Sequence, residues 1–108
     1  MHDRQPPTAR VAVDGLTTDG DETHLTGRAG TTAVRAAVPA VADEAQARRY
    51  LATVRRVDRV EIHLAPDQTS CQAIGRRSRL PFRSPIRLPV ALGLARLGVP
   101  TVLTGLQI

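Results

Sequence analysis

The chain has 108 residues, of which 42 % are hydrophobic and 23 % are charged, and its formal net charge is +5. This length and composition suit one folded domain, and they exclude a disordered chain and a chain with two separate cores. A single cysteine, Cys71, excludes an internal disulfide bond, so we expect a protein of the reducing cytoplasm.

All 15 basic residues are arginine, and the chain has no lysine and no asparagine. Codon bias in a GC-rich genome explains this better than selection for binding, because binding alone would not remove lysine from the whole surface. Arginine keeps its capacity for bidentate contacts with phosphate and carboxylate groups in either case.

The N-terminal part predicts a tail and a group of strands. Residues 1–8 are mostly polar and hold two prolines, which indicates a flexible tail before a single α/β domain over residues 9–108. Residues 10–16 and 22–28 flank the turn signal Asp19-Gly20 and predict a β-hairpin. Residues 31–38 add a third strand that ends before a proline.

A helix is predicted to follow. Asp43 has the side chain of an N-cap, and Gln46 stands three residues later, as in a capping box. The next apolar residues recur at helical spacing and form one inward stripe: Ala47, Tyr50, Leu51 and Val54.

The second half predicts a strand, an irregular stretch, a helix and a strand. Residues 59–64 alternate between apolar and polar side chains, whereas residues 66–88 contain several prolines and predict no regular element. Residues 89–97 predict a short buried helix that stops at Gly98, and residues 99–104 predict a last strand.

The expected fold is therefore α/β, of the α+β type, with a small mixed sheet of about four or five strands and two helices on one face. An N-terminal β-hairpin precedes a β-α-β unit, whose two strands at 59–64 and 99–104 are expected to be parallel.

Charge is distributed unevenly along the chain. Residues 1–45 carry a net charge of −3, whereas residues 46–108 carry +8 and no acidic residue follows Asp67. Such a block attracts anionic partners through its field alone.

The densest basic segment, residues 74–87, is expected to be an arginine-rich binding loop. Phosphate contacts would come from its arginines, and its one aromatic side chain could stack on an unpaired base. The same residue types suit an acidic protein surface, which would make the chain an interaction subunit of a larger complex. A solvated loop with no partner is the third interpretation. The predicted binding residues are Arg76, Arg77, Arg79, Phe82, Arg83 and Arg87.

An enzyme is the less favoured alternative. Cys71 and Arg77 have the spacing at which cysteine phosphatases hold a phosphoryl group. Pro81 and Pro85 oppose this hypothesis because they exclude the helix that normally follows such a loop. His63 is a candidate base only if a carboxylate and a nucleophile lie nearby.

The remaining expectations are mostly negative. The histidines and Cys71 lack metal-ligand spacing, no glycine-rich nucleotide loop is present, and no segment suits a membrane. We therefore expect no metal, no cofactor and no membrane contact. If the last strand or the first hairpin lies at a sheet edge, a homodimer could form by pairing there.

Overall fold

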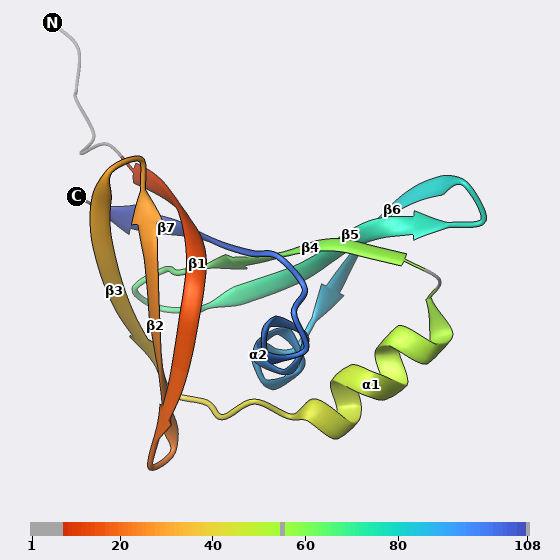
Figure 1. The fold of residues 1–108 in the computed structure, drawn as a ribbon, viewed down its shortest axis with the longest axis horizontal. Coiled ribbons are helices and arrows are strands. Elements are labelled where there is room, and N and C mark those ends of the chain that lie inside the picture. The colour runs from red at the N-terminus through yellow and green to blue at the C-terminus, as the bar shows by residue number, and fades with distance from the viewer. Residues whose placement is uncertain (1–7, 55, 108) are drawn as a thin grey trace, which may run out of the picture.

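The computed structural model describes residues 8–54 and 56–107, and these form one seven-stranded mixed sheet with two helices on the same side (Figure 1). The strand order in the sheet is β3-β2-β1-β7-β4-β5-β6. The elements in chain order are β1 (Thr8–Asp19), β2 (Glu22–Ala29), β3 (Thr32–Val38), α1 (Glu44–Thr53), β4 (Arg56–His63), β5 (Ser70–Arg77), β6 (Leu80–Ile86), α2 (Leu88–Arg96) and β7 (Thr101–Gln107). Of the predicted tail, residues 1–7 lie outside the described residues and Thr8 begins β1.

The α+β class is as predicted, but the expected sheet of four or five strands is wrong. The two additional strands are β5 and β6, which form where residues 66–88 were expected to be irregular. Pro81 and Pro85 both lie in β6. They are tolerated because β6 is the edge of the sheet, where a residue without an N–H group need not interrupt a hydrogen-bonded ladder.

The first three strands confirm the predicted hairpin and the predicted third strand. β1 pairs antiparallel with β2, and β2 pairs antiparallel with β3. Gly20 and Gly30 have φ values of 63° and 61° at the first positions of the two loops, where a side chain would be strained.

α1 begins and α2 begins and ends as their sequences indicate, whereas α1 ends at Thr53, one residue before the predicted stripe does. The Asp43 carboxylate accepts a hydrogen bond from the Gln46 N–H at 3.0 Å, which confirms the predicted N-cap of α1. Pro89 lies in the first turn of α2, and Gly98, with φ of 96°, follows its end. Gly93 of α2 lies so close to the Asp43 carbonyl that a side chain there would collide with α1.

The last strand lies inside the sheet. β7 pairs with β4 in the parallel direction, as predicted, and with β1 in the antiparallel direction. The two edges of the sheet are therefore β3 and β6, and neither the last strand nor the first hairpin provides one.

The core lies between the sheet and the helices. α2 packs on β4 and β5, and α1 packs on α2. Fully buried aliphatic side chains from both layers fill this space: Val60, Ile62, Leu92, Leu94 and Leu103. We call the opposite side of β4, β5 and β6, which neither helix covers, the open face. No helix in the described part of the chain is long and apolar enough to cross a membrane.

Candidate anion-binding surface

The predicted binding loop at 74–87 is a β-hairpin. β5 and β6 pair along their whole length and are joined by a two-residue turn, Ser78-Arg79. The expectation of an irregular loop is therefore wrong, because the prolines that suggested a loop occupy an edge strand. In a strand, successive side chains point to opposite faces of the sheet, which they need not do in a loop.

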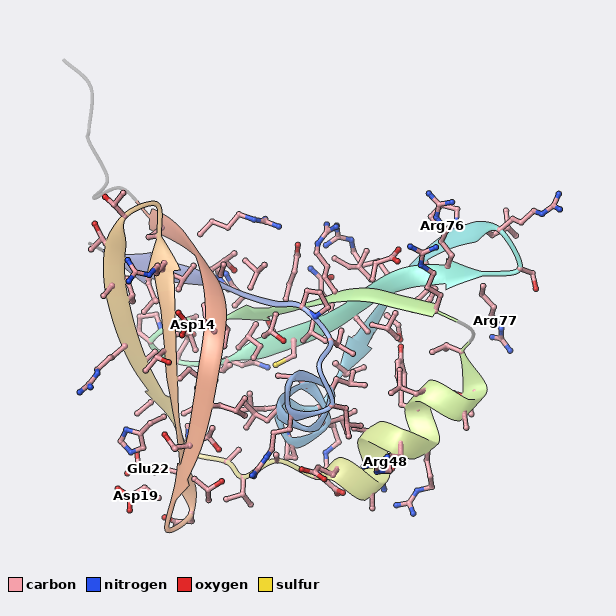
Figure 2. All side chains as sticks on the ribbon, viewed as in Figure 1. Asp14, Asp19, Glu22, Arg48, Arg76 and Arg77 are labelled. Atoms are coloured by element: carbon pink, nitrogen blue, oxygen red, sulfur yellow. The ribbon has the colours of Figure 1, made fainter. Side chains whose placement is uncertain are left out.

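Alternation divides the predicted binding residues between two sides of the sheet. Residues directly opposite each other in an antiparallel pair share a face. Arg76 faces Pro81 in the register, and Gly75, which is buried, faces Phe82. Arg76 therefore lies on the open face, whereas Arg77 points to the helix side, and Figure 2 shows these two side chains pointing in opposite directions.

The other predicted residues are also separated. Arg83 pairs with Ile74 and lies on the open face. Phe82 is half-buried on the helix side, so it is not beside Arg83 and cannot stack on a base held there. Arg87 is exposed at the start of α2, where it borders a groove with Arg49 and Tyr50. The six predicted residues do not form one surface.

A hollow at the tip of the hairpin gathers three arginines. It has a volume of about 450 Å³ and is lined by Arg56, Arg76, Ser78 and Arg79, with no carboxylate among these residues. Arg56 and Arg76 are directly opposite each other on β4 and β5. We call this the basic hollow. Arg56 was not among the predicted binding residues, because its place beside Arg76 depends on the pairing of β4 with β5.

The turn at the hollow has an uncommon backbone. Ser78 has φ of 50° and Arg79 has φ of 74°, both in the left-handed region. Two-residue hairpin turns of this type normally use asparagine, aspartate or glycine, so the pairing of the two strands must hold these residues in place. This turn fixes the Arg79 backbone at the end of the hairpin.

The acidic residues of the first hairpin lie far from the basic hollow. Figure 2 shows Asp14, Asp19 and Glu22 at one end of the molecule and Arg76 at the other. Within residues 8–54 and 56–107, no carboxylate lies within ion-pair distance of Arg76 or Arg79. Arg56 does have such a partner, since its Nε lies 2.7 Å from the Asp58 carboxylate. The basic hollow therefore keeps a net positive charge.

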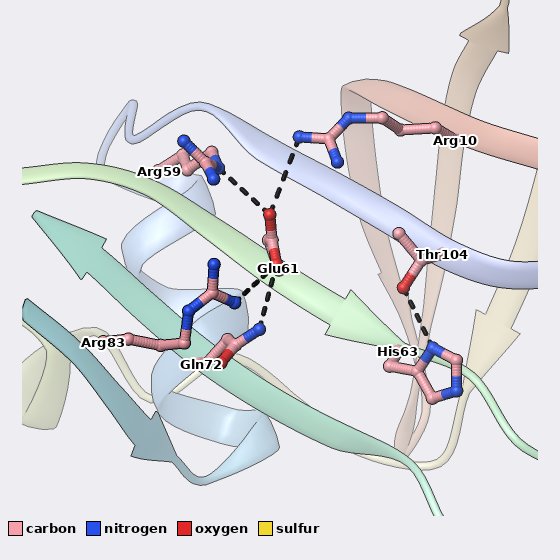
Figure 3. A network of polar contacts seen from close by, with 7 residues as sticks. All are labelled: Arg10, Arg59, Glu61, His63, Gln72, Arg83 and Thr104. Atoms are coloured by element: carbon pink, nitrogen blue, oxygen red, sulfur yellow. Dashed lines mark hydrogen bonds and ion pairs between the residues drawn. The ribbon is translucent and has the colours of Figure 1, made fainter.

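A second group of arginines surrounds Glu61 on the open face (Figure 3). The Glu61 carboxylate accepts hydrogen bonds from Arg59 at 3.0 Å, Gln72 at 2.9 Å and Arg83 at 3.3 Å, and Arg10 lies 3.6 Å from it. These residues come from β1, β4, β5 and β6. We call this group the Glu61 cluster.

The surroundings of Glu61 favour its ionised form. Burial alone would raise the pKa of Glu61, but the hydrogen bonds from Arg59 and Gln72 and the charges of Arg59 and Arg83 outweigh it, so the pKa lies below its usual value. Glu61 therefore remains a carboxylate at neutral pH. Three guanidinium groups around one carboxylate leave a net charge of about +2.

A depression of about 480 Å³ lies beside the Glu61 cluster. His63 is exposed at its border, and its Nδ1 lies 3.0 Å from the Thr104 hydroxyl, with which it forms a hydrogen bond. Glu61 and His63 share a side of β4, as the alternation predicted. The polar lining residues are Glu61, His63, Ser70, Gln72, Arg83 and Thr104.

Cys71 has the surroundings of an inert thiol. It lies in the core and is only 7 % exposed, and burial raises the pKa of its thiol to about 11. Arg77 lies six residues along the same strand, which is about 20 Å in an extended chain. The two residues are thus too far apart to hold one phosphoryl group, and a protonated thiol is a poor nucleophile.

No group of three or more histidine, cysteine, aspartate or glutamate side chains in the described residues could hold a metal ion.

The chain matches no known protein family, no curated protein and no solved structure.

Proposed function

We propose that this chain is a small binding module that engages an anionic partner through the basic hollow. The observation that supports this proposal is the convergence of Arg56, Arg76 and Arg79 on one concave site whose lining contains no carboxylate. Guanidinium groups held in a site present several N–H donors to phosphate or carboxylate oxygens at once.

Nucleic acid is the first candidate partner. Arginine contacts to phosphate oxygens need no particular base sequence, and they suit a surface without stacking aromatic residues. Ser78 adds a hydroxyl of the kind that also contacts phosphates.

An acidic protein surface is the second candidate partner, and it would make the chain an accessory subunit of a complex. Leu80 supports it, because this residue is 71 % exposed at the tip of the hairpin, next to Arg79 and on the same side as Arg77, opposite Arg76. An exposed leucine beside arginine is more useful against a protein than against a phosphate backbone.

Binding measured against salt concentration tests the function. We expect the affinity for single-stranded DNA or RNA to fall steeply with salt, and Arg76→Ala/Arg79→Ala to flatten that dependence by about 1.4 in the logarithmic slope, as for two lost phosphate contacts. Arg48→Ala/Arg49→Ala removes the same charge from the exposed side of α1 and is the matched control. Equal slopes for the two double variants, or no binding at low salt, would contradict the proposal.

We further propose a homodimer that forms through β3. Since β7 and the first hairpin are internal, β3 is the edge strand that lacks proline, whereas β6 carries Pro81 and Pro85. Unpaired backbone groups along an edge can pair with a second copy.

A cytoplasmic location remains part of the proposal, supported by the free thiol of Cys71.

A further inference from the structure

The basic hollow and the Glu61 cluster lie on the same face of the sheet. Arg56 and Arg59 are three residues apart, so a regular strand would point them to opposite sides. The irregularity in β4 between Val57 and Arg59 restores the alternation, because Arg56 pairs with Arg76 and Arg59 pairs with Ile74 on the same side of β5. The bulge thus aligns the two groups along β4.

The Glu61 cluster keeps arginine groups free for a ligand. Glu61 is only 13 % exposed, whereas the side chains of Arg10, Arg59 and Arg83 are 60 %, 39 % and 57 % exposed. A guanidinium has five N–H donors, and each of these arginines uses few of them on Glu61. Glu61 therefore positions the three arginines without neutralising them.

The distance between the two groups indicates the size of the ligand. Because of the bulge, Arg56 and Glu61 lie opposite Arg76 and Gln72, which are four residues apart on β5, or about 13 Å. A single phosphate or carboxylate group cannot contact both groups, whereas a chain of phosphates can. The depression beside the cluster continues the same line and offers donors from Ser70 and His63.

We propose that the open face is a track for the phosphodiester backbone of a single-stranded nucleic acid, which runs from the basic hollow across the Glu61 cluster to the depression beside His63. This inference depends on the proposed function and specifies its ligand. The sheet is strongly twisted (Figure 1), and a single strand can follow that twist more easily than a stiff duplex. The contacts are to phosphate groups, which carry no base information, so binding is expected to be independent of sequence. Phe82, which faces the helix side, does not add stacking on the open face.

Fluorescence anisotropy with labelled oligothymidylates of about twelve and about four nucleotides tests the track. For the longer oligonucleotide, we expect Arg83→Ala to lower affinity about five-fold at 0.1 M salt and to reduce the logarithmic salt slope by about 0.7, the value for one single-strand phosphate contact. The shorter oligonucleotide can occupy the basic hollow alone, so the effect of Arg83→Ala on it should be smaller. Arg48→Ala is the control of equal charge on the helix side and should change neither quantity by as much.

Arg10→Ala is the second variant, because Arg10 is exposed and makes only the longest contact of the cluster. It should reproduce the effect of Arg83→Ala while thermal unfolding shows an intact fold. If both variants behave like Arg48→Ala while Arg76→Ala/Arg79→Ala still weakens binding, the proposed function stands and the track is wrong. Equal affinity for duplex DNA, or tighter binding of polyglutamate, would also overturn the track, and absence of salt-dependent binding to every probe would overturn both proposals.

Discussion

Glu61 shows how one residue can organise a surface that no helix covers. Its carboxylate lies among arginines from three strands, and Gln72 adds a fourth contact (Figure 3). Because each arginine is partly exposed, the individual ion pairs contribute little free energy, and the cluster acts mainly by fixing where the guanidinium groups lie.

The pH dependence of stability should report this role. The pKa of Glu61 is lower in the folded chain than in the unfolded chain, so its ionised form contributes stability above the unfolded pKa, and that contribution is lost as the pH falls through the folded pKa. We expect Glu61→Gln to lower the free energy of unfolding by about 1 kcal/mol at neutral pH. The difference from the original chain should shrink as the pH falls below the usual titration range of a glutamate carboxyl, because the carboxylate of the folded chain then becomes protonated.

Urea denaturation at several pH values measures this effect. Asp67→Asn, at an exposed position after β4, is the matched control and should show no such convergence. If the difference in free energy of unfolding between Glu61→Gln and the original chain stayed constant from neutral to acid pH, the lowered pKa of Glu61 would be contradicted.

The sequence could predict only the part of the Glu61 cluster that comes from one strand. Alternation in residues 59–64 places Glu61 and His63 on the polar side of β4, as observed. Arg10 and Arg83 join the cluster from β1 and β6, and no local pattern encodes which strands become neighbours. The buried state of Cys71 likewise depends on β5, a strand that was not predicted.

Elements whose signals were local were predicted well. The N-cap at Asp43 and the first hairpin appear in the structure. The parallel pair of β4 and β7 was also predicted, from the order of strand, helix and strand and not from a local signal. β5 and β6 were missed because prolines at 81 and 85 count against a strand unless the strand lies at an edge, which only the assembled sheet reveals.

The strained turn between β5 and β6 can be tested by one substitution. Ser78 has φ of 50°, a region in which asparagine is several-fold enriched over other residues with a side chain. We expect Ser78→Asn to stabilise the chain by about 0.5–1 kcal/mol, because the hairpin would no longer force an unfavoured backbone. Thermal or urea unfolding measures the change.

Ser84→Asn is the control for the turn, since residue 84 lies within β6 and does not have a positive φ. This variant should leave stability unchanged or lower it. A loss of stability in Ser78→Asn would show that the serine makes a contribution beyond the turn.

At the scale of the whole molecule, the two edges of the sheet differ. Ala29 and Thr32 close a two-residue hairpin, so alternation directs the free backbone groups of Ala33, Arg35 and Ala37 outward from β3. We expect Ala37→Pro to remove one outward N–H donor and to shift the proposed dimer toward the 11.6 kDa monomer.

Sedimentation equilibrium at several concentrations measures that shift. Ala37→Val keeps the backbone donor and should keep the association of the original chain. A purely monomeric original chain, or a dimer unaffected by Ala37→Pro, would contradict pairing through β3.

The prolines of β6 have a consequence for polymerisation. Once two copies join through β3, each outer border of the combined sheet is a β6 strand with Pro81 and Pro85. Such a border is a poor template for a further copy, so growth by strand addition stops at two. In the proposed dimer, the prolines that hid this strand in the sequence would therefore also oppose the growth of fibrils.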